Sequence, residues 1–534
     1  PCSLFVLSFI IVFHFSANVS LLIRLISHFH SFKVDVSISL IRIFSLDMIH
    51  IVVPSTTTLI ERSDGVSKYT AFNIHINGWL HATIRYSMLH KFAETVRLKF
   101  DSRFGGRFVL PEFPPKKLVF GRLEGSSLDE RRLKIAKYLQ TLVQQPEIIR
   151  SAVVERTFLE FQLESYRPAS SSVNLEVYLG DGSKHCIRCG VLLNARDVMK
   201  VLSETLECDF DLFYQYFGLF MVRERGEEGS SYSSPLDMLP VRLLRNFESP
   251  YVSLQLSNQR FASRGVQYKL QLRRMVWEVR IHERLIECNV IKELLVKQAR
   301  AELECGLFAP NNGEMAEQLD TLKQQPYSME RFIRLCTQQS SYGYEDLGVA
   351  DCELPQRPNT KIRASMRVGR RQLLLVCTES GEEWIFRATR IRIWRISQPS
   401  CVVDPLLFQF EYLVGKEHFE WITLHTDQAI LLSLLLQSIG ADILNEHHEA
   451  AKEAAREALS ENDVISPLKM PSSSSSSKLT DDNVHGSSST MTSSNRGYTP
   501  YTPASLVTPS NVLPASVIGT TNSSFAMEIT DDDL

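Results

Sequence analysis

The sequence predicts a multidomain α+β protein with a disordered C-terminal tail, and three observations lead to this prediction. Two β-hairpin patterns, each followed by a helical pattern, occupy the first half of the chain. A mainly helical stretch follows them, and then come consecutive strand patterns closed by one long apolar helix. In the tail, residues 450–459 extend a charged helix, and beyond them serine, threonine, proline and asparagine dominate. Such a composition buries too little apolar surface to offset chain entropy.

Composition limits the function classes. The chain has 534 residues, enough for about three to five domains, and a formal net charge of only −3, so no nucleic-acid partner is expected. Charge is unevenly spread: residues 48–165 hold 17 Lys and Arg against 12 Asp and Glu, a surplus of five positive charges, whereas the chain ends on an acidic segment. This asymmetry favours an anionic surface as one partner and a different partner at the C-terminus. The ten cysteines show no disulfide spacing and indicate free thiols in a reducing compartment.

Residues 1–47 are rich in Leu, Ile, Val and Phe and read at face value as a signal peptide or membrane anchor. However, the chain begins with Pro1 instead of Met, and the apolar stretch is interrupted by Arg24 and Lys33. Met48 opens the segment MIHIVVP, which suits the beginning of a protein chain. We therefore expect residues 1–47 to be a non-native extension. An integral-membrane or secreted protein that uses them stays open as an alternative.

Residues 48–165 form the predicted basic domain. Strand patterns flank Asn77-Gly78, the dipeptide of a two-residue hairpin turn, and a helix is predicted from residue 87. The Pro111–Pro115 segment predicts a surface loop, and a further helix is expected after residue 129.

A candidate anion site spans this domain. Arginine, tyrosine and serine lie together at the end of the hairpin, a lysine follows the proline loop, and an arginine opens the next helix. Guanidinium groups clamp phosphate oxygens, a tyrosine offers a flat face to a ring, and lysine adds a point charge. The set therefore suits a phosphorylated sugar headgroup, and its members are Arg85, Tyr86, Ser87, Lys116 and Arg131.

The middle of the chain predicts two lobes. In residues 173–260, a hairpin turning at 180–182 and a helix from Ala195 to Leu206 make the ββα opening of a ubiquitin-like fold. Residues 261–345 are assigned to an all-helical lobe, because the pattern is mainly helical from Lys269 onward. Cys186 and Cys189 make a lone CxxC without a second pair, so no metal site is expected.

Residues 346–447 predict a PTB/PH-like sandwich, with strands from Lys361 to Ile396 and from Phe410 to Leu424 and a closing helix from about Asp427 to Leu444. This fold adds an extended peptide to an exposed strand edge. By the period of two in the strand 388–397, Arg392 and Trp394 share one face, so Trp394 is expected to be partly exposed.

The tail, residues 448–534, ends in FAMEITDDDL, a plausible docking peptide with acidic residues before a terminal leucine. We find no GxSxG, Walker A or complete HExxH motif, since Lys452 stands where the second histidine would be. We therefore expect a protein that is not an enzyme and needs no cofactor, metal or catalytic residue.

The order of these motifs resembles the PX (phox-homology) domain, and the whole chain is similar to the PX-FERM sorting nexins, especially the sorting-nexin-seventeen type. The resemblance implies that Arg85 and Ser87 hold the 3-phosphate of phosphatidylinositol 3-phosphate and that Tyr86 stacks on the inositol ring. Lys116 and Arg131 would reach its other phosphates and hydroxyls.

The resemblance also implies a cargo site in the third FERM lobe, where the residues matching Arg392, Trp394 and Ile439 line a groove for NPxY or NPxF receptor tails. The family has a branched apolar residue on the groove-facing helix where Gly440, next to Ile439, stands here. The tail is similar to the one that engages the retriever complex, with Asp533 and Leu534 as docking residues.

The function implied is an adaptor on the cytoplasmic face of early endosomes that promotes recycling of receptors and spares them lysosomal degradation. The alternative within this fold is a FERM-type scaffold that links membrane receptors to cytoskeletal or signalling proteins.

Overall fold

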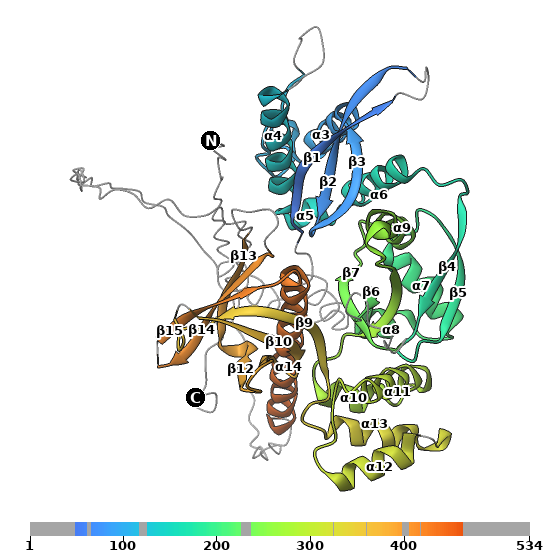
Figure 1. The fold of residues 1–534 in the computed structure, drawn as a ribbon, viewed down its shortest axis with the longest axis vertical. Coiled ribbons are helices and arrows are strands. Elements are labelled where there is room, and N and C mark those ends of the chain that lie inside the picture. Colours follow the sequence, from blue (N-terminus) through green and yellow to red (C-terminus); the bar gives the residue numbers. More distant parts are fainter. Residues whose placement is uncertain are drawn as a thin grey trace, which may run out of the picture. The chain divides into compact units, whose positions relative to one another are not determined.

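The computed structural model describes residues 49–462 except 61–65, 117–124, 226–235, 324, 359, 398–404 and 417 (Figure 1). The predictions for residues 1–47, for the tail beyond 462, and for Asp533 and Leu534 lie outside the described residues.

The N-terminal domain combines a three-stranded antiparallel sheet with helices. Its strands lie in the order β1 (Ile51–Ile60), β2 (Lys68–Ile76) and β3 (Trp79–Arg85). The helices are α3 (Tyr86–Phe100), α4 (Ser126–Val143), α5 (Pro146–Ile149) and α6 (Ala152–Tyr166). Asn77 and Gly78 have φ values of 52° and 84°, so the predicted hairpin turn is confirmed in a conformation that requires positive φ at both positions.

The first lobe has a five-stranded sheet in the order β5-β4-β8-β6-β7. Its elements are β4 (Ser172–Tyr178), β5 (Lys184–Gly190), α7 (Ala195–Thr205), α8 (Phe210–Tyr216), β6 (Phe217–Glu224), β7 (Met238–Leu243), α9 (Pro250–Phe261) and β8 (Tyr268–Arg274). The prediction that this lobe ends at residue 260 and that a helical pattern starts at Lys269 is wrong, because β8 is the central strand of the sheet. Its sequence YKLQLRR alternates apolar and polar residues, which is the strand signal that the helical assignment overlooked. Six of its seven residues are buried, because the strand lies between β4 and β6.

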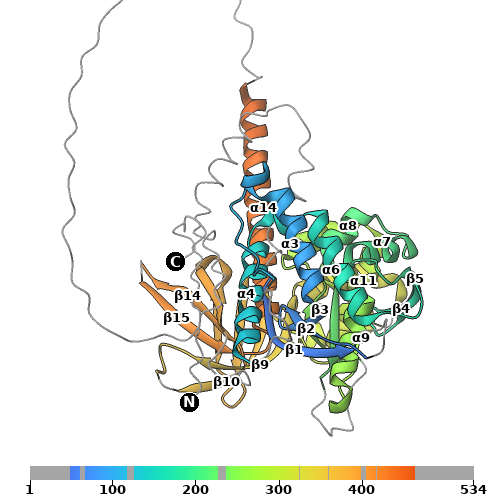
Figure 2. The ribbon, with the colours of Figure 1, turned by 90° about the horizontal axis from the view of Figure 1, so that it is seen from above.

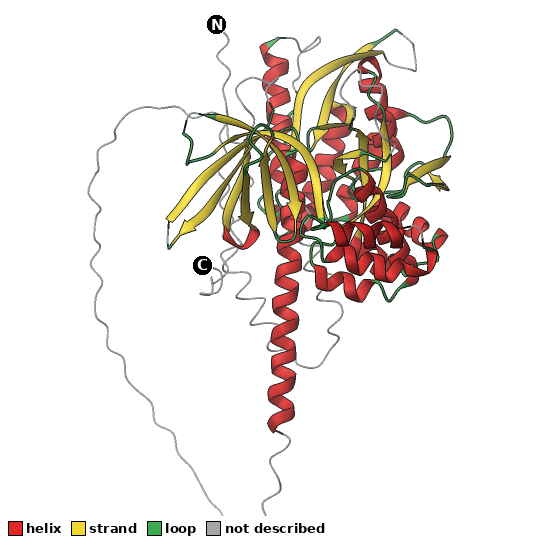
Figure 3. Ribbon diagram, turned by 60° about the horizontal axis from the view of Figure 1, so that its bottom comes forward, coloured by secondary structure: helices red, strands yellow, loops and turns green. Residues whose placement is uncertain are grey.

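The second lobe is helical, as predicted, and consists of α10 (Val279–Leu285), α11 (Asn289–Glu304), α12 (Gly313–Lys323) and α13 (Met329–Thr337). In Figure 3 these helices form a separate group beside the sheets. A single apolar core of buried residues runs through the first and second lobes, from Leu175 to Tyr342.

The third lobe is an antiparallel sheet of seven strands in the order β12-β11-β10-β9-β15-β14-β13, closed by one helix. The strands are β9 (Tyr344–Glu353), β10 (Lys361–Gly369), β11 (Gln372–Cys377), β12 (Glu383–Arg387), β13 (Ile391–Ser397), β14 (Leu407–Gly415) and β15 (His418–His425). The sandwich closed by a helix is the predicted architecture, with β13 at one end of the strand order.

The closing helix α14 (Ala429–Asn462) continues past Leu444 without a break and includes the predicted helical extension 450–459 (Figure 2). By length and composition, the segment Ala429–His447 is apolar enough to cross a membrane, but 83% of it is buried inside the protein. Its hydrophobicity is accounted for by the core of the third lobe.

Candidate functional site

The candidate anion site begins where β3 passes directly into α3, at Arg85 and Tyr86. Arg85 is the N-cap residue of α3 with extended backbone (φ −72°, ψ 151°), and Tyr86 is the first residue of the helix. The Tyr86 hydroxyl donates a 2.7 Å hydrogen bond to the carbonyl oxygen of Pro114. Partial burial raises the pKa of Tyr86, so the phenol stays protonated and able to donate.

Arg131 reaches the same loop from α4. Its Nη2 donates to the carbonyl oxygen of Pro115 at 3.0 Å, and its guanidinium carbon lies 4.8 Å from the centroid of the Tyr86 ring. The residue is only 9% exposed. Tyr86 and Arg131 thus contact each other and hold two consecutive carbonyls of the proline loop, immediately before the exposed Lys116.

The other two predicted residues flank this pair. Arg85 and Ser87 are exposed on either side of Tyr86 in the chain. The Arg85 guanidinium lies over the ring of Tyr69 on the neighbouring strand β2, with its central carbon 5.1 Å from the ring centroid. The structure therefore brings Tyr86 and Arg131 together beside Lys116, and it places Arg85 and Ser87 next to them through the backbone.

Sequence reasoning missed the aromatic side chains that surround the site. Phe113 and His90 lie with ring centroids 5.6 Å and 5.9 Å from that of Tyr86, and Tyr69 stacks under Arg85. A signal for Tyr69 existed in the hairpin register: Arg85 pairs with Ala71, so Tyr69 is its diagonal neighbour across the strands.

The neighbouring Arg132 has a different role from Arg131. Its Nη1 donates to the carbonyl oxygen of Val53 on β1 at 2.6 Å, and its Nε donates to Asp129 at 3.2 Å. Arg132 therefore ties α4 to the sheet.

In the third lobe, the predicted exposure of Trp394 is wrong. Trp394 is 2% exposed, and its Nε1–H donates to Ser433 Oγ on α14 at 2.7 Å. The register of β13 against β14 shifts between Ile391 and Ile393, which inserts one extra residue. This β-bulge resets the alternation, so that Trp394 points toward α14 instead of sharing a face with Arg392.

The other two predicted cargo residues also differ from expectation. Arg392 lies on the opposite face from Trp394, where it binds Glu411 at 2.6 Å and stacks over Phe419 at 4.3 Å. Ile439 is a residue of α14, and its side chain is completely buried in the core of the third lobe. The structure therefore does not bring Arg392, Trp394 and Ile439 to one exposed surface.

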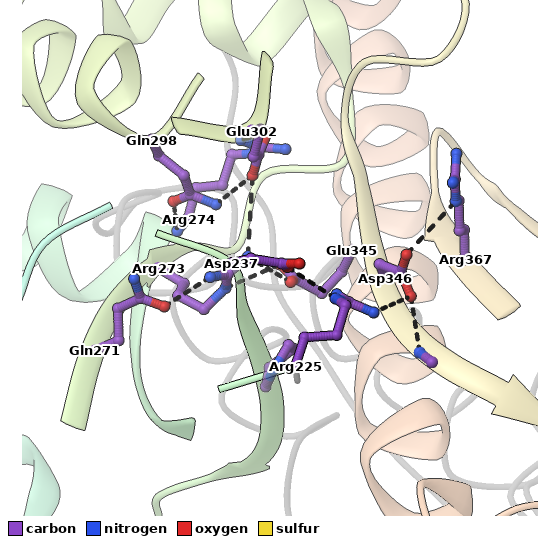
Figure 4. Close-up of polar contacts among 12 residues, drawn as sticks. Arg225, Asp237, Gln271, Arg273, Arg274, Gln298, Glu302, Glu345, Asp346 and Arg367 are labelled. Atoms are coloured by element: carbon purple, nitrogen blue, oxygen red, sulfur yellow. Dashed lines mark hydrogen bonds and ion pairs between the residues drawn. The ribbon is translucent and has the colours of Figure 1, made fainter. Parts of the chain in front are cut away.

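A buried charge cluster joins the three lobes (Figure 4). Arg273 on β8 binds Glu345 on β9 at 2.6 Å, and its neighbour Arg274 binds Glu302 on α11 at 2.8 Å. Burial raises the pKa of Glu345, an effect that the adjacent Arg273 opposes. Residues from the first, second and third lobes therefore meet in one ion network.

Asp346 extends this cluster by binding Arg225 of the first lobe at 3.3 Å and Arg367 of the third lobe at 3.7 Å (Figure 4). Within the described part of the chain, no group of three or more His, Cys, Asp and Glu side chains is arranged to hold a metal ion. The cluster is thus an assembly of paired charges that fixes how the lobes meet.

The N-terminal domain also packs on the first lobe through buried contacts. The Gln162 amide on α6 donates to Ser253 Oγ at 2.9 Å and accepts from the Ser249 backbone N–H at 2.7 Å. His81 on β3 packs against Phe158 and against Phe247 of the first lobe, with ring centroids 5.6 Å and 6.1 Å away. Burial lowers the pKa of His81 to about 3.

Three family models match the chain. The PX domain matches residues 72–162, the F1 lobe of the FERM domain of sorting nexins 17, 27 and 31 matches residues 173–277, and the sorting nexin 17 FERM C-terminal domain matches residues 343–444. The predicted order of a PX domain followed by FERM lobes is therefore confirmed. The F1 match includes β8, in agreement with the sheet.

The chain is also similar to whole curated proteins. It is 30% identical to sorting nexin-17 of Rattus norvegicus and of Homo sapiens over 416 residues, which cover 74% of this chain and 82% of each relative. It is 27% identical to sorting nexin-31 of Homo sapiens over 399 residues, or 71% of this chain and 83% of the relative. Among solved structures, the FERM and C-terminal domain complex of Drosophila Merlin aligns at 13% identity and a TM-score of 0.33, over 52% of this chain and 98% of that one.

Proposed function

Because this chain belongs to the PX-FERM sorting nexins of the sorting nexin-17 type, we propose that it recycles receptors by binding phosphatidylinositol 3-phosphate and NPxY or NPxF tails together. Membership of the family supports the coarser part of this function, a sorting adaptor that attaches peripherally to endosomal membranes. The exact lipid, the cargo motif, the early endosome and the recycling outcome are our proposal.

The observation that carries the lipid part is the contact of Tyr86 and Arg131 on the proline loop beside Lys116. An arginine has five N–H donors, so the bond from Arg131 to Pro115 leaves others for a phosphate or hydroxyl oxygen. Arg85 and Ser87 are exposed beside Tyr86 and supply a guanidinium and a hydroxyl for the 3-phosphate. Lys116 adds positive charge at the same place.

The test is binding of the full chain to liposomes with and without phosphatidylinositol 3-phosphate. Arg85→Ala should weaken the lipid-dependent binding by about tenfold or more, the size of one lost charge-assisted contact. Arg156→Ala, which removes an exposed arginine from α6, is the matched control for general charge and should bind as the parent does. Equal binding by Arg85→Ala and the control would remove the lipid assignment.

The cargo part rests on the place of β13 in the third lobe. This strand stands at the end of the sheet order, and Trp394 joins it to α14. A PTB-like lobe takes an extended peptide by adding it as a further strand at such a position, with side chains directed toward the helix. Trp394 then supports the strand and the helix from inside the core. Calorimetry with NPxY and NPxF peptides, against the same peptides with Ala in place of Asn and Pro, tests this part.

The acidic C-terminus is the proposed docking site for the retriever complex, through Asp533 and Leu534. Tethering of lipid, cargo and partner contacts in one chain raises the effective concentration of each, so that weak contacts combine. Removal of Leu534 should divert bound receptors to lysosomes. Unchanged recycling would instead favour a scaffold without this partner.

A further inference from the structure

A second tryptophan binds α14 from outside the third lobe. Trp277 follows β8 and lies within the segment that matches the F1 lobe. It is 3% exposed, and its Nε1–H donates to the fully buried Ser438 Oγ on α14 at 2.9 Å. An indole from the first lobe therefore holds the helix that closes the third.

The two tryptophan side chains bind α14 on different faces of the helix. Trp394 of β13 binds Ser433, and Trp277 binds Ser438, five residues further along. At 3.6 residues per turn, positions five apart lie about 140° apart around a helix axis and about 7.5 Å apart along it. The helix is thus fixed between strand β13 on one side and the first lobe on another.

Further polar contacts bind the chain at residues 428 and 446, on either side of the two serines of α14. Gln428, just before the helix, donates to the carbonyl oxygen of Pro240 on β7 at 3.1 Å. At the far end Arg371 pairs with Glu446 of α14 and, at 2.6 Å, with Glu278, next to Trp277. Apolar side chains alone would tolerate a small shift or rotation of the helix, but directional bonds specify one register.

We propose that Trp277 is a positioning residue for the cargo peptide: through Ser438 it sets where α14 lies relative to β13, so that the first lobe determines the geometry of the third-lobe groove. This inference rests on the proposed binding of receptor tails along β13. Peptide affinity then depends on a residue of a different lobe that does not line the groove.

The test compares Trp277→Phe, which removes the indole N–H, with Ser438→Ala, which removes its acceptor. Each should weaken binding of an NPxY peptide about tenfold, as expected for one buried hydrogen bond, and the double variant should lose little more, because both changes break the same bond. Liposome binding through the N-terminal domain should stay unchanged in all three. The matched control is Asn246→Ala, which breaks the bond of Asn246 to Tyr214 inside the first lobe and should leave peptide affinity unchanged.

Parent-level peptide affinity in Trp277→Phe and Ser438→Ala would overturn the inference, whether or not their unfolding midpoints fall. Hydrogen exchange separates this failure from failure of the proposed function. If the parent chain binds no peptide, the cargo proposal falls. Faster exchange of the amides of residues 429–446 in Trp277→Phe, but not in Asn246→Ala, would still support the positioning of α14, and unchanged exchange would overturn it.

Discussion

Arg131 and Tyr86 stack with the guanidinium carbon 4.8 Å from the ring centroid, and they bind the carbonyls of two adjacent prolines. Each side chain therefore orders the same loop, from a different helix. Lys116 follows these prolines directly, so its position depends on both contacts. The position of the residues proposed to bind the lipid therefore depends on the contact between Arg131 and Tyr86.

Arg131→Lys should reduce lipid-dependent liposome binding about tenfold, because lysine keeps the charge but loses the planar guanidinium that stacks on Tyr86. Arg132→Lys is the neighbouring control on α4, since Arg132 ties the helix to Val53. It should lower the free energy of unfolding with little change in liposome affinity. Equal lipid affinities for the two variants would contradict the separate roles of Arg131 in the anion site and Arg132 in the fold.

Tyr86→Phe should lower the free energy of unfolding by about 1 kcal/mol, because the ring remains but its hydrogen bond to Pro114 is lost. Urea unfolding followed by tryptophan fluorescence measures this loss. Tyr86→Ala should lower liposome affinity in addition, since it also removes the flat face that the inositol ring is proposed to use.

Trp394→Phe and Ser433→Ala should each destabilise the protein by about 1 kcal/mol, because each breaks the buried hydrogen bond between the indole N–H and the serine hydroxyl. Thermal unfolding of the two single variants and the double variant measures the coupling between the positions. Additive losses would show that the indole and the hydroxyl do not depend on each other.

Glu345→Ala should destabilise by about 3–5 kcal/mol, because it leaves the buried Arg273 without the carboxylate that binds it at 2.6 Å. Glu330→Ala removes one partner of an exposed pair with Arg334 on α13 and should cost no more than about 1 kcal/mol. Similar losses in the two variants, measured by urea unfolding, would argue against a special role for the interlobe cluster.

Acidification should destabilise the contact between the N-terminal domain and the first lobe. Burial lowers the pKa of His81 to about 3, from an ordinary value of 6.5, so the unfolded chain binds more protons between these values. The stability contributed by neutral His81 is full above about pH 6.5 and is lost as the pH falls toward 3. Unfolding free energy should therefore drop between pH 7.5 and 5, by up to about 2 kcal/mol from this group.

His81→Gln removes the titrating group and should reduce this pH dependence. Part of the acid sensitivity should remain, because burial also lowers the pKa values of His50 and His282, each to about 4. An identical slope of unfolding free energy against pH in the parent and in His81→Gln would show that His81 does not contribute.

Local chemistry made much of the fold predictable. Asn77-Gly78 marked its turn because few other residues adopt positive φ at both positions. The residues of the candidate anion site were predicted together because phosphate recognition needs their particular groups. Strand β8 was missed although its sequence YKLQLRR alternates apolar and polar residues, because the helical pattern that follows it was extended back over it. Its partners β4 and β6 lie far away in the sequence, so local pattern did not reveal the pairing.

The sequence by itself determined the succession of domains, the family and the chemical types available at the N-terminal site, since these depend on short-range patterns and residue identity. Only the tertiary structure decided which way Trp394 faces, which neighbour of a pair of arginines reaches Tyr86, and that Trp277 binds α14. A one-residue bulge reverses every later side chain in a strand, and contacts between distant segments exist only after packing, so neither is encoded in local periodicity.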